Sequence, residues 1–166
     1  MFNLAAVRYT LRDRSLDVYV SGCLGEGGVH CINCHNPQIW DPNFGRPWIT
    51  FVESISSTIK RSGGMIQSIR IYGGEPLEKP EEDLIGFLDF LAGFNKPLWL
   101  FTRFSLEKVP ESILERLEYI KCGPYDETQK GEVTYYGVTL PTLNQKIYHR
   151  DEFLKGDAGY EIQGIH

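Results

Sequence analysis

The sequence has no long apolar run and no block of like charges. No stretch of 18 uncharged apolar residues occurs, which argues against a transmembrane helix. Residues 1–9 lack the basic segment and apolar run of a secretory signal, so we expect a cytoplasmic protein. The net charge of -5 gives no general attraction to nucleic acid or to an anionic membrane, and neither is an expected partner.

Internal repeats and low-complexity segments are also absent. With 166 residues the chain is long enough for one domain with a hydrophobic core and too short for two. We therefore expect a single domain over residues 1–166. Residues 126–166 are polar, rich in Gly and Tyr and without clear periodicity, so we expect them to form a C-terminal extension.

Cysteine is scarce, yet three of the four cysteines lie within twelve residues, at Cys23, Cys31 and Cys34. Clustered thiols in a chain without a secretory signal indicate metal ligation and not disulfides. Thiolates are the usual ligands of iron-sulfur clusters, and three of them would leave the fourth iron of a cubane open. Glycines around them, such as Gly22 and Gly25, permit positive φ angles.

Two other interpretations of the cysteines stay open. A structural zinc site would need a fourth ligand, which His30, His35 or Cys122 could supply. Ribbon-type zinc sites usually show two C-x2-C pairs, and this chain has one. Inert buried thiols are the other possibility. The pattern favours an iron-sulfur cluster over both, and Cys122 itself is expected to be a small apolar residue at the end of a strand.

The apolar pattern predicts strands that alternate with helices. We expect strands over residues 4–9, 17–21, 66–71, 98–101 and 119–121, and helices over residues 49–61, 80–93 and 110–117. Thr50 and Glu53 have the spacing of a capping box at the first helix. This order predicts an α/β fold with a mainly parallel sheet and crossover helices. The three tryptophans are expected to be core or rim aromatics: Trp40, Trp48 and Trp99.

Unusual segments follow the carboxyl ends of four predicted strands. They are the cysteine loop, Gly73-Gly74-Glu75, Thr102 and Cys122-Gly123-Pro124-Tyr125. In parallel α/β architectures this rim of the sheet is where ligands bind. The sequence therefore predicts one ligand site that combines these segments.

Residues 18–145 resemble the activating enzymes of anaerobic (class III) ribonucleotide reductase, within the radical S-adenosylmethionine (SAM) superfamily. The matching segments are residues 18–23, 31–40, 72–77, 98–102 and 120–125, with a weaker match at Gly137 and Asn144-Gln145. One departure is that seven residues separate Cys23 from Cys31, where the superfamily usually has three. The longer loop keeps all three cysteines.

The resemblance implies a role for each matching residue. The residues implied as ligands of a [4Fe-4S] cluster are Cys23, Cys31 and Cys34. SAM would chelate the open iron, with Gly73, Gly74 and Glu75 facing its methionine end. Thr102 would contact the carboxylate or the ribose, and Asn33 and His35 would lie against the adenine.

The resemblance also implies a fold and an activity. The fold would be an incomplete TIM-like barrel of the radical SAM type, since a full eight-unit barrel takes ~250 residues. The enzyme would cleave SAM reductively and generate a glycyl radical on anaerobic ribonucleotide reductase, with a flavodoxin or ferredoxin as electron donor. The alternative is a small-molecule radical SAM enzyme resembling the 7-carboxy-7-deazaguanine synthases, which also accept an expanded first cysteine spacing.

Overall fold

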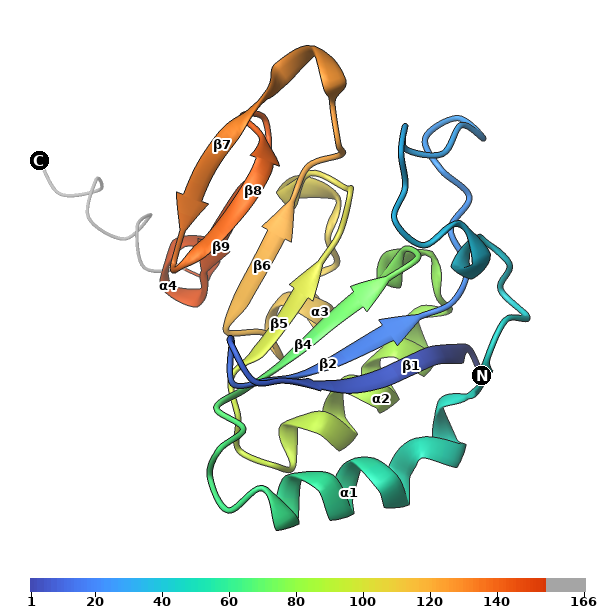
Figure 1. The fold of residues 1–166 in the computed structure, drawn as a ribbon, viewed down its shortest axis with the longest axis vertical. Coiled ribbons are helices and arrows are strands. Elements are labelled where there is room, and N and C mark those ends of the chain that lie inside the picture. The colour runs from blue at the N-terminus through green and yellow to red at the C-terminus, as the bar shows by residue number, and fades with distance from the viewer. Residues whose placement is uncertain (155–166) are drawn as a thin grey trace, which may run out of the picture.

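The computed structural model describes residues 1–154 (Figure 1). Its strands are β1 (Asn3–Thr10), β2 (Ser15–Val20), β3 (Arg46–Pro47), β4 (Ser68–Gly73), β5 (Leu98–Phe101), β6 (Tyr119–Cys122), β7 (Lys130–Tyr135), β8 (Val138–Thr142) and β9 (Lys146–His149). Its α-helices are α1 (Val52–Arg61), α2 (Glu81–Ala92), α3 (Glu111–Leu114) and α4 (Arg150–Phe153). Short 3-10 turns are η1 (Pro37–Trp40), η2 (Trp48–Phe51), η3 (Pro76–Glu78), η4 (Leu106–Lys108) and η5 (Glu127–Gln129).

Within residues 1–154 the central sheet has seven strands in the order β3-β1-β2-β4-β5-β6-β9. The four middle strands, β2, β4, β5 and β6, are parallel, and β1 and β9 pair with them antiparallel. Strands β7 and β8 form a separate hairpin. The predicted α/β class and mainly parallel sheet are confirmed, and the sheet does not close into a barrel in the part of the chain described.

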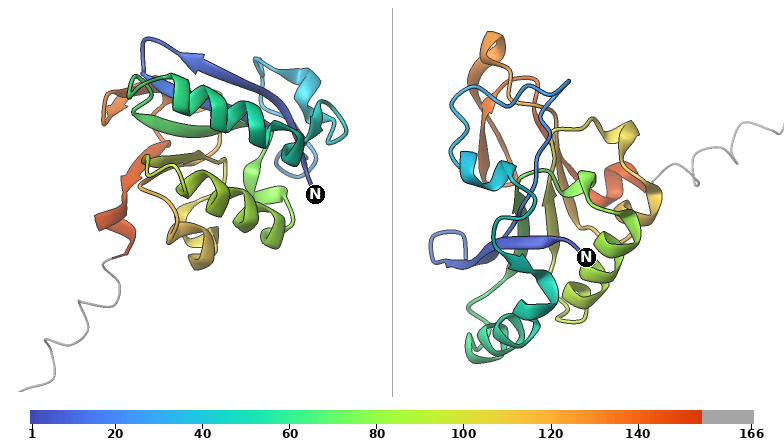
Figure 2. Two further views of the ribbon diagram at one scale, coloured as in Figure 1. Left: turned by 90° about the horizontal axis from the view of Figure 1, so that it is seen from below. Right: turned by 90° about the vertical axis from the view of Figure 1, so that its right-hand side faces the viewer.

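Alternation along the parallel strands gives the sheet two different faces. Aliphatic residues such as Val18, Ile71 and Leu100 point to one face and pack against α1, α2 and α3. Figure 2 shows α1 and α2 on this same side of the sheet. Burying each such side chain contributes ~1.5–3 kcal/mol, so this face anchors the fold.

The opposite face of the sheet is lined by aromatic side chains. Tyr72 lies 4.2 Å from Phe101 and Trp99 lies 4.0 Å from Tyr119, measured between ring centroids. The β7–β8 hairpin packs over part of this face through Leu140. Tyr72 and Phe101 remain half-buried, which leaves an aromatic surface beside the carboxyl ends of the parallel strands.

The first helix starts differently from the prediction. It begins at Val52, after the 3-10 turn η2, and Phe51 is its N-cap with no side-chain capping bond. The predicted Thr50–Glu53 capping box is wrong, because Thr50 lies inside the turn, where its hydroxyl donates to the carbonyl of Pro47 at 2.7 Å.

The sequence predicted no regular structure after residue 126, yet the chain forms β7, β8, β9 and α4 there. Exposed and half-buried residues alternate along β7. The alternation is weak in the sequence because the half-buried positions include Gly131, which has no side chain. The hairpin turn is Tyr136-Gly137, both with positive φ. Strand β9 then joins the main sheet beside β6. The remainder of the expected extension, residues 155–166, lies outside the described residues.

The rim of the sheet is where the chain is least regular. In Figure 1 the carboxyl ends of β2, β4, β5 and β6 point toward the long loop between β2 and η1 and toward the hairpin side of the molecule.

Among the described helices, none is both long and apolar enough to cross a membrane.

Candidate functional site

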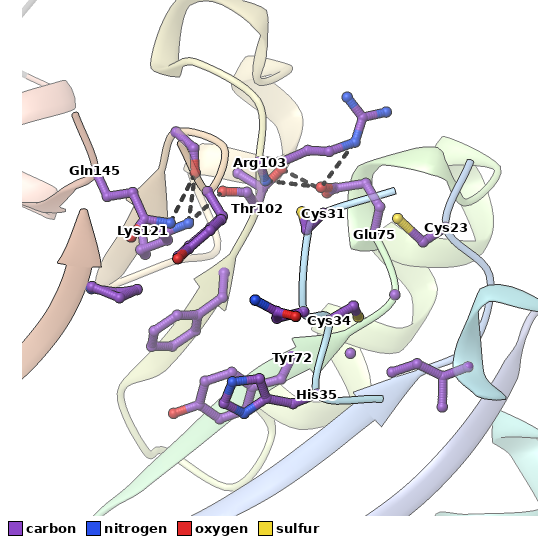
Figure 3. A pocket seen from close by; sticks show the side chains of 18 of the residues that line it. Cys23, Cys31, Cys34, His35, Tyr72, Glu75, Thr102, Arg103, Lys121 and Gln145 are labelled. Atoms are coloured by element: carbon purple, nitrogen blue, oxygen red, sulfur yellow. Dashed lines mark hydrogen bonds and ion pairs between the residues drawn. The ribbon is translucent and has the colours of Figure 1, made fainter. Parts of the chain in front are cut away.

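A pocket of about 520 Å³ lies at the carboxyl ends of the parallel strands. Its lining includes all the residues predicted to hold the cluster or SAM: Cys23, Cys31, Asn33, Cys34, His35, Gly73, Gly74, Glu75 and Thr102. Of the predicted segment Cys122-Gly123-Pro124-Tyr125, Gly123 and Tyr125 line it and Cys122 and Pro124 do not. Its volume falls within the ~300–1,000 Å³ typical of small-molecule sites. The structure brings these residues together in one pocket, and Figure 3 shows the cysteines and Glu75 in it.

The cysteine loop is closed at its base by main-chain bonds. The amides of Gly22 and Cys23 donate to the carbonyls of Ile39 and Trp40, at 2.7 and 3.1 Å. The Nε2 atom of His30 donates to the carbonyl of Cys23 at 2.8 Å, and its ring stacks on Trp40 with a centroid distance of 3.8 Å. These bonds give the loop a defined shape, and His30 is occupied in holding it.

The extended spacing between the first two cysteines folds into a tight turn. Glu26 and Val29 exchange both main-chain hydrogen bonds, at 2.9 and 3.0 Å. Gly27 and Gly28 between them have φ of 58° and 83°, the left-handed conformation that a two-residue hairpin turn requires. The extra residues therefore fold back on themselves as a small hairpin, and Cys23, Cys31 and Cys34 still line one pocket.

The Gly-Gly-Glu segment packs directly on the cysteine loop. The amide of Glu75 donates to the carbonyl of Gly22 at 2.8 Å, and that of Gly74 donates to the carbonyl of Val20 at 2.8 Å. A Cβ atom on Gly74 would lie 2.1 Å from the carbonyl oxygen of Gly22. Gly74 is thus required for close approach of the two segments, and the motif is more than a tight turn.

Glu75 is the central buried acid of the pocket, with 1% of its surface exposed. Its carboxylate accepts hydrogen bonds from the Thr102 hydroxyl at 2.6 Å, the Arg103 amide at 2.9 Å and the Leu77 amide at 3.1 Å. Burial raises the pKa of Glu75, while these three donors act in the opposite direction. The carboxylate links the end of β4 to the end of β5 and fixes Thr102 beside it.

Lys121 is a pocket residue that sequence reasoning missed. It lies on β6 beside Cys122, and the alternation of the strand sends Cys122 into the core and Lys121 into the pocket. Its ammonium donates to the carbonyl of Gly123 at 2.6 Å, and burial lowers its pKa to about 8. One signal in the sequence could have predicted this position: Lys121 is a charged residue directly before Cys122 at the end of a predicted strand, so the two side chains point to opposite faces of the sheet.

Two distant segments of the chain bind each other at the edge of the pocket. The side-chain amide of Asn144 donates to the carbonyl of Pro124 at 2.9 Å, and that of Gln145 lies 3.5 Å from the carbonyl of Gly123. Gly123 has a φ of 102° and its Cβ position is 3.1 Å from the carbonyl oxygen of Asn144. Gln145 and Tyr125 thereby join the lining of the pocket.

The donor set fits an iron-sulfur cluster better than a zinc ion. One zinc ion holds all its sulfur ligands at about 2.3 Å, which requires them to converge on a point. No three His, Cys, Asp or Glu side chains in residues 1–154 converge in that way. Of the three candidate fourth zinc ligands, Cys122 is in the core and His30 bonds to the carbonyl of Cys23, whereas His35 lines the pocket. A cubane cluster binds each thiolate at a different iron, so its ligands do not converge on one point, and the three cysteines of this pocket fit that arrangement better.

The tryptophans divide between the core and the site. Trp99 is buried and Trp48 packs against the main core, as predicted for core aromatics. Trp40 lines the pocket, and its indole N–H donates to the Sγ atom of Cys34 at 3.3 Å. Hydrogen bonds to thiolate sulfur tune the potential of a cluster, so Trp40 is suited to do so.

Comparison with known proteins agrees with this geometry. A search of curated proteins gave no match. The model of a protein family described as a 4Fe-4S single cluster domain matches residues 13–147, which include the three cysteines, Gly73-Gly74-Glu75 and Lys121. The match covers most of the chain. The chain therefore belongs to the family of 4Fe-4S single cluster domains.

Proposed function

We propose that this protein is a radical SAM activating enzyme that generates a glycyl radical on anaerobic ribonucleotide reductase. The observation that carries the proposal is the shared pocket of three cysteines and Gly73-Gly74-Glu75. The fourth cysteine, Cys122, is buried in the core with 4% of its surface exposed. A cluster held by the other three keeps one iron open, and that iron is where SAM binds.

The cofactors supply the bond cleavage and the protein supplies the positioning. A bound, reduced cluster would supply the electron for cleavage of the SAM sulfonium into methionine and a 5′-deoxyadenosyl radical. Cys23, Cys31 and Cys34 would hold the cluster, and the indole N–H of Trp40, which donates to Cys34 Sγ, would stabilise negative charge on that thiolate.

Glu75 and Lys121 carry charges opposite to those of the ammonium and the carboxylate of the methionine part of SAM. A carboxylate offers about four lone-pair sites. Glu75 uses three of them, for the Thr102 hydroxyl and the amides of Arg103 and Leu77, and the Nε atom of Arg103 forms an ion pair with Oε2 at 3.9 Å. The remaining lone-pair site would accept from the ammonium of SAM. Lys121 carries the positive charge that pairs with the SAM carboxylate. Asn33 and His35, at the wall of the pocket, are the residues for the adenine.

The open architecture suits a protein substrate. The parallel strands β2, β4, β5 and β6 with helices on one face correspond to part of a TIM-like barrel, and we propose that this is an incomplete radical SAM barrel. Its uncovered side gives a reductase loop access to the pocket. Cys31 is exposed, so an electron donor such as a flavodoxin or ferredoxin can approach the cluster from outside.

A change at Lys121 is expected to weaken SAM binding in a pH-dependent way. The ammonium is charged below its pKa of about 8 and neutral above it, so the affinity of the wild type for SAM should fall as the pH rises through 8. Lys121→Met should bind SAM about 10- to 100-fold more weakly at pH 7, because a charge-assisted hydrogen bond is lost. Anaerobic calorimetry at pH 7 and pH 9 measures both effects.

The matched control for this change is Lys60→Met, which removes an exposed lysine from α1, outside the pocket lining. It should keep wild-type affinity and wild-type pH dependence. Equal affinities for Lys121→Met and the wild type at pH 7 would remove Lys121 from the SAM site.

The activity itself is tested with the reductase from the same source. Incubation of the anaerobically reconstituted protein with SAM, dithionite and that reductase should produce a glycyl-radical doublet in the electron paramagnetic resonance spectrum. Each radical should accompany one 5′-deoxyadenosine and one methionine. SAM cleavage without a radical on the reductase, together with turnover of a pterin-like compound, would replace this proposal with a small-molecule enzyme resembling the 7-carboxy-7-deazaguanine synthases.

A further inference from the structure

One polar side chain of the pocket has unused hydrogen-bonding capacity. Gln145 has 5% of its surface exposed and lines the pocket. Its amide oxygen Oε1 has no hydrogen-bond partner within residues 1–154. Because a buried polar atom without a partner is unfavourable, such atoms are rare in folded proteins, and those in a pocket point to a ligand.

The amide nitrogen of Gln145 is only weakly engaged. It lies 3.5 Å from the carbonyl oxygen of Gly123, at the outer limit for a hydrogen bond. That oxygen already accepts a bond of 2.6 Å from the ammonium of Lys121. A small rotation of the Gln145 side chain therefore frees one donor and one acceptor together, with little lost from the fold.

Gln145 also lies away from Cys23, the first proposed cluster ligand. Figure 3 shows it on the side of the pocket opposite Cys23, with Lys121 next to it. The cysteines and Glu75 occupy the other side. A second reactant that enters the pocket past Leu140 and Pro141 of β8 would therefore come into reach of Gln145.

We infer that Gln145 is a positioning residue for the glycine-bearing peptide segment of the protein substrate, to which it binds through both halves of its side-chain amide. The inference rests on the proposed function. A peptide group has one N–H donor and one carbonyl acceptor, the same pair that a glutamine amide complements. Glycine has no side chain to recognise, so its selection depends on main-chain bonds. Leu140, Pro141 and Phe101 line the same pocket and would exclude water from those bonds.

The chemistry of the step makes positioning the main task of such a residue. One hydrogen atom moves from the glycine Cα to C5′ of the 5′-deoxyadenosyl radical, which becomes 5′-deoxyadenosine. The unpaired electron stays on the Cα. No proton or charge is released, so no acid or base is needed, and the protein contributes by holding the two carbon atoms in reach of each other.

The test compares Gln145→Leu with the wild type in three assays: SAM affinity by anaerobic calorimetry, 5′-deoxyadenosine formation without reductase, and glycyl-radical yield with the reductase. Iron content and circular dichroism establish that the variant folds and holds its cluster. If Gln145→Leu does not fold, Gln145→Met replaces it in the same three assays. We expect SAM affinity and reductase-free cleavage within about twofold of the wild type. We expect the radical yield per SAM cleaved to fall about tenfold, as for two neutral hydrogen bonds lost.

The control is Gln67→Leu, which makes the same substitution at an exposed glutamine outside the pocket lining. It should keep the radical yield within about twofold of the wild type. A Gln145→Leu variant with unchanged radical yield would overturn the inference, and so would a parallel loss of SAM affinity, which would assign Gln145 to SAM. If the wild type itself forms no radical on the reductase, the proposed function fails and the inference fails with it.

Discussion

Replacing Cys23, Cys31 or Cys34 by alanine should each leave the protein without a stable [4Fe-4S] cluster. All three line one pocket and the only other cysteine is Cys122, so no spare thiolate can take the place of a lost ligand. Anaerobic reconstitution of the wild type should give about four irons and four sulfides per chain, and each variant should give far less. Iron and sulfide analysis together with the visible absorption spectrum measure this.

The control for these variants is Cys122→Ala. Its thiol is in the hydrophobic core, and burial raises its pKa to about 12, which disfavours the thiolate that binds metal. The variant should keep a full cluster and lose only about 1 kcal/mol of stability through the small cavity. A normal cluster in Cys23→Ala would show that the hairpin-bearing loop does not supply its first ligand from this position.

The second large effect is expected at Gly74. An added methyl group would lie 2.1 Å from the carbonyl oxygen of Gly22, which is main chain and cannot rotate away. The Gly74→Ala variant must move the cysteine loop away from the Gly-Gly-Glu segment, and the hydrogen bond from Glu75 to Gly22 lengthens or breaks. We expect a loss of about 3 kcal/mol of stability, at the upper end for overpacked buried sites, and a much reduced cluster content.

Urea denaturation of the cluster-free protein and iron content after reconstitution measure the two effects. Gly86→Ala is the matched control, because Gly86 is exposed on α2 and a Cβ there would meet nothing within 4 Å. It should raise stability by about 0.5–1 kcal/mol, since alanine favours a helix over glycine. A Gly74→Ala variant as stable as the wild type and with a full cluster would contradict the claim that close packing of the cysteine loop on Gly73-Gly74-Glu75 holds the site together.

The succession of strands and helices along the chain up to residue 122, and the end of the sheet at which the site lies, could be predicted because both depend on local patterns. Alternation in residues such as Ile69 and Ile71 marks a buried strand, and the unusual segments after each strand meet at one rim by the geometry of a parallel sheet. The cysteine spacing predicted the kind of cofactor. These features need no knowledge of which distant residues touch.

The rest depends on contacts that the sequence does not display. Strand β9 exists because it pairs with β6, more than twenty residues earlier, and it has only four residues of its own. The hydrogen bonds that satisfy Glu75 come from Thr102 and Arg103 on another strand end. Lys121 and Gln145 enter the pocket through such pairings. Both lie in segments that match the resembled family, but the sequence assigned a role to neither.

The measurement that most directly tests this account is electron nuclear double resonance on the dithionite-reduced protein with isotopically labelled SAM. The central claim is that three cysteines hold the cluster and SAM binds its open iron. With ¹⁵N in the amino group and ¹⁷O in the carboxylate of SAM, the account predicts hyperfine coupling of both nuclei to the cluster, absent when SAM is omitted. A cluster spectrum that SAM leaves unchanged, with no coupling to either label, would contradict it.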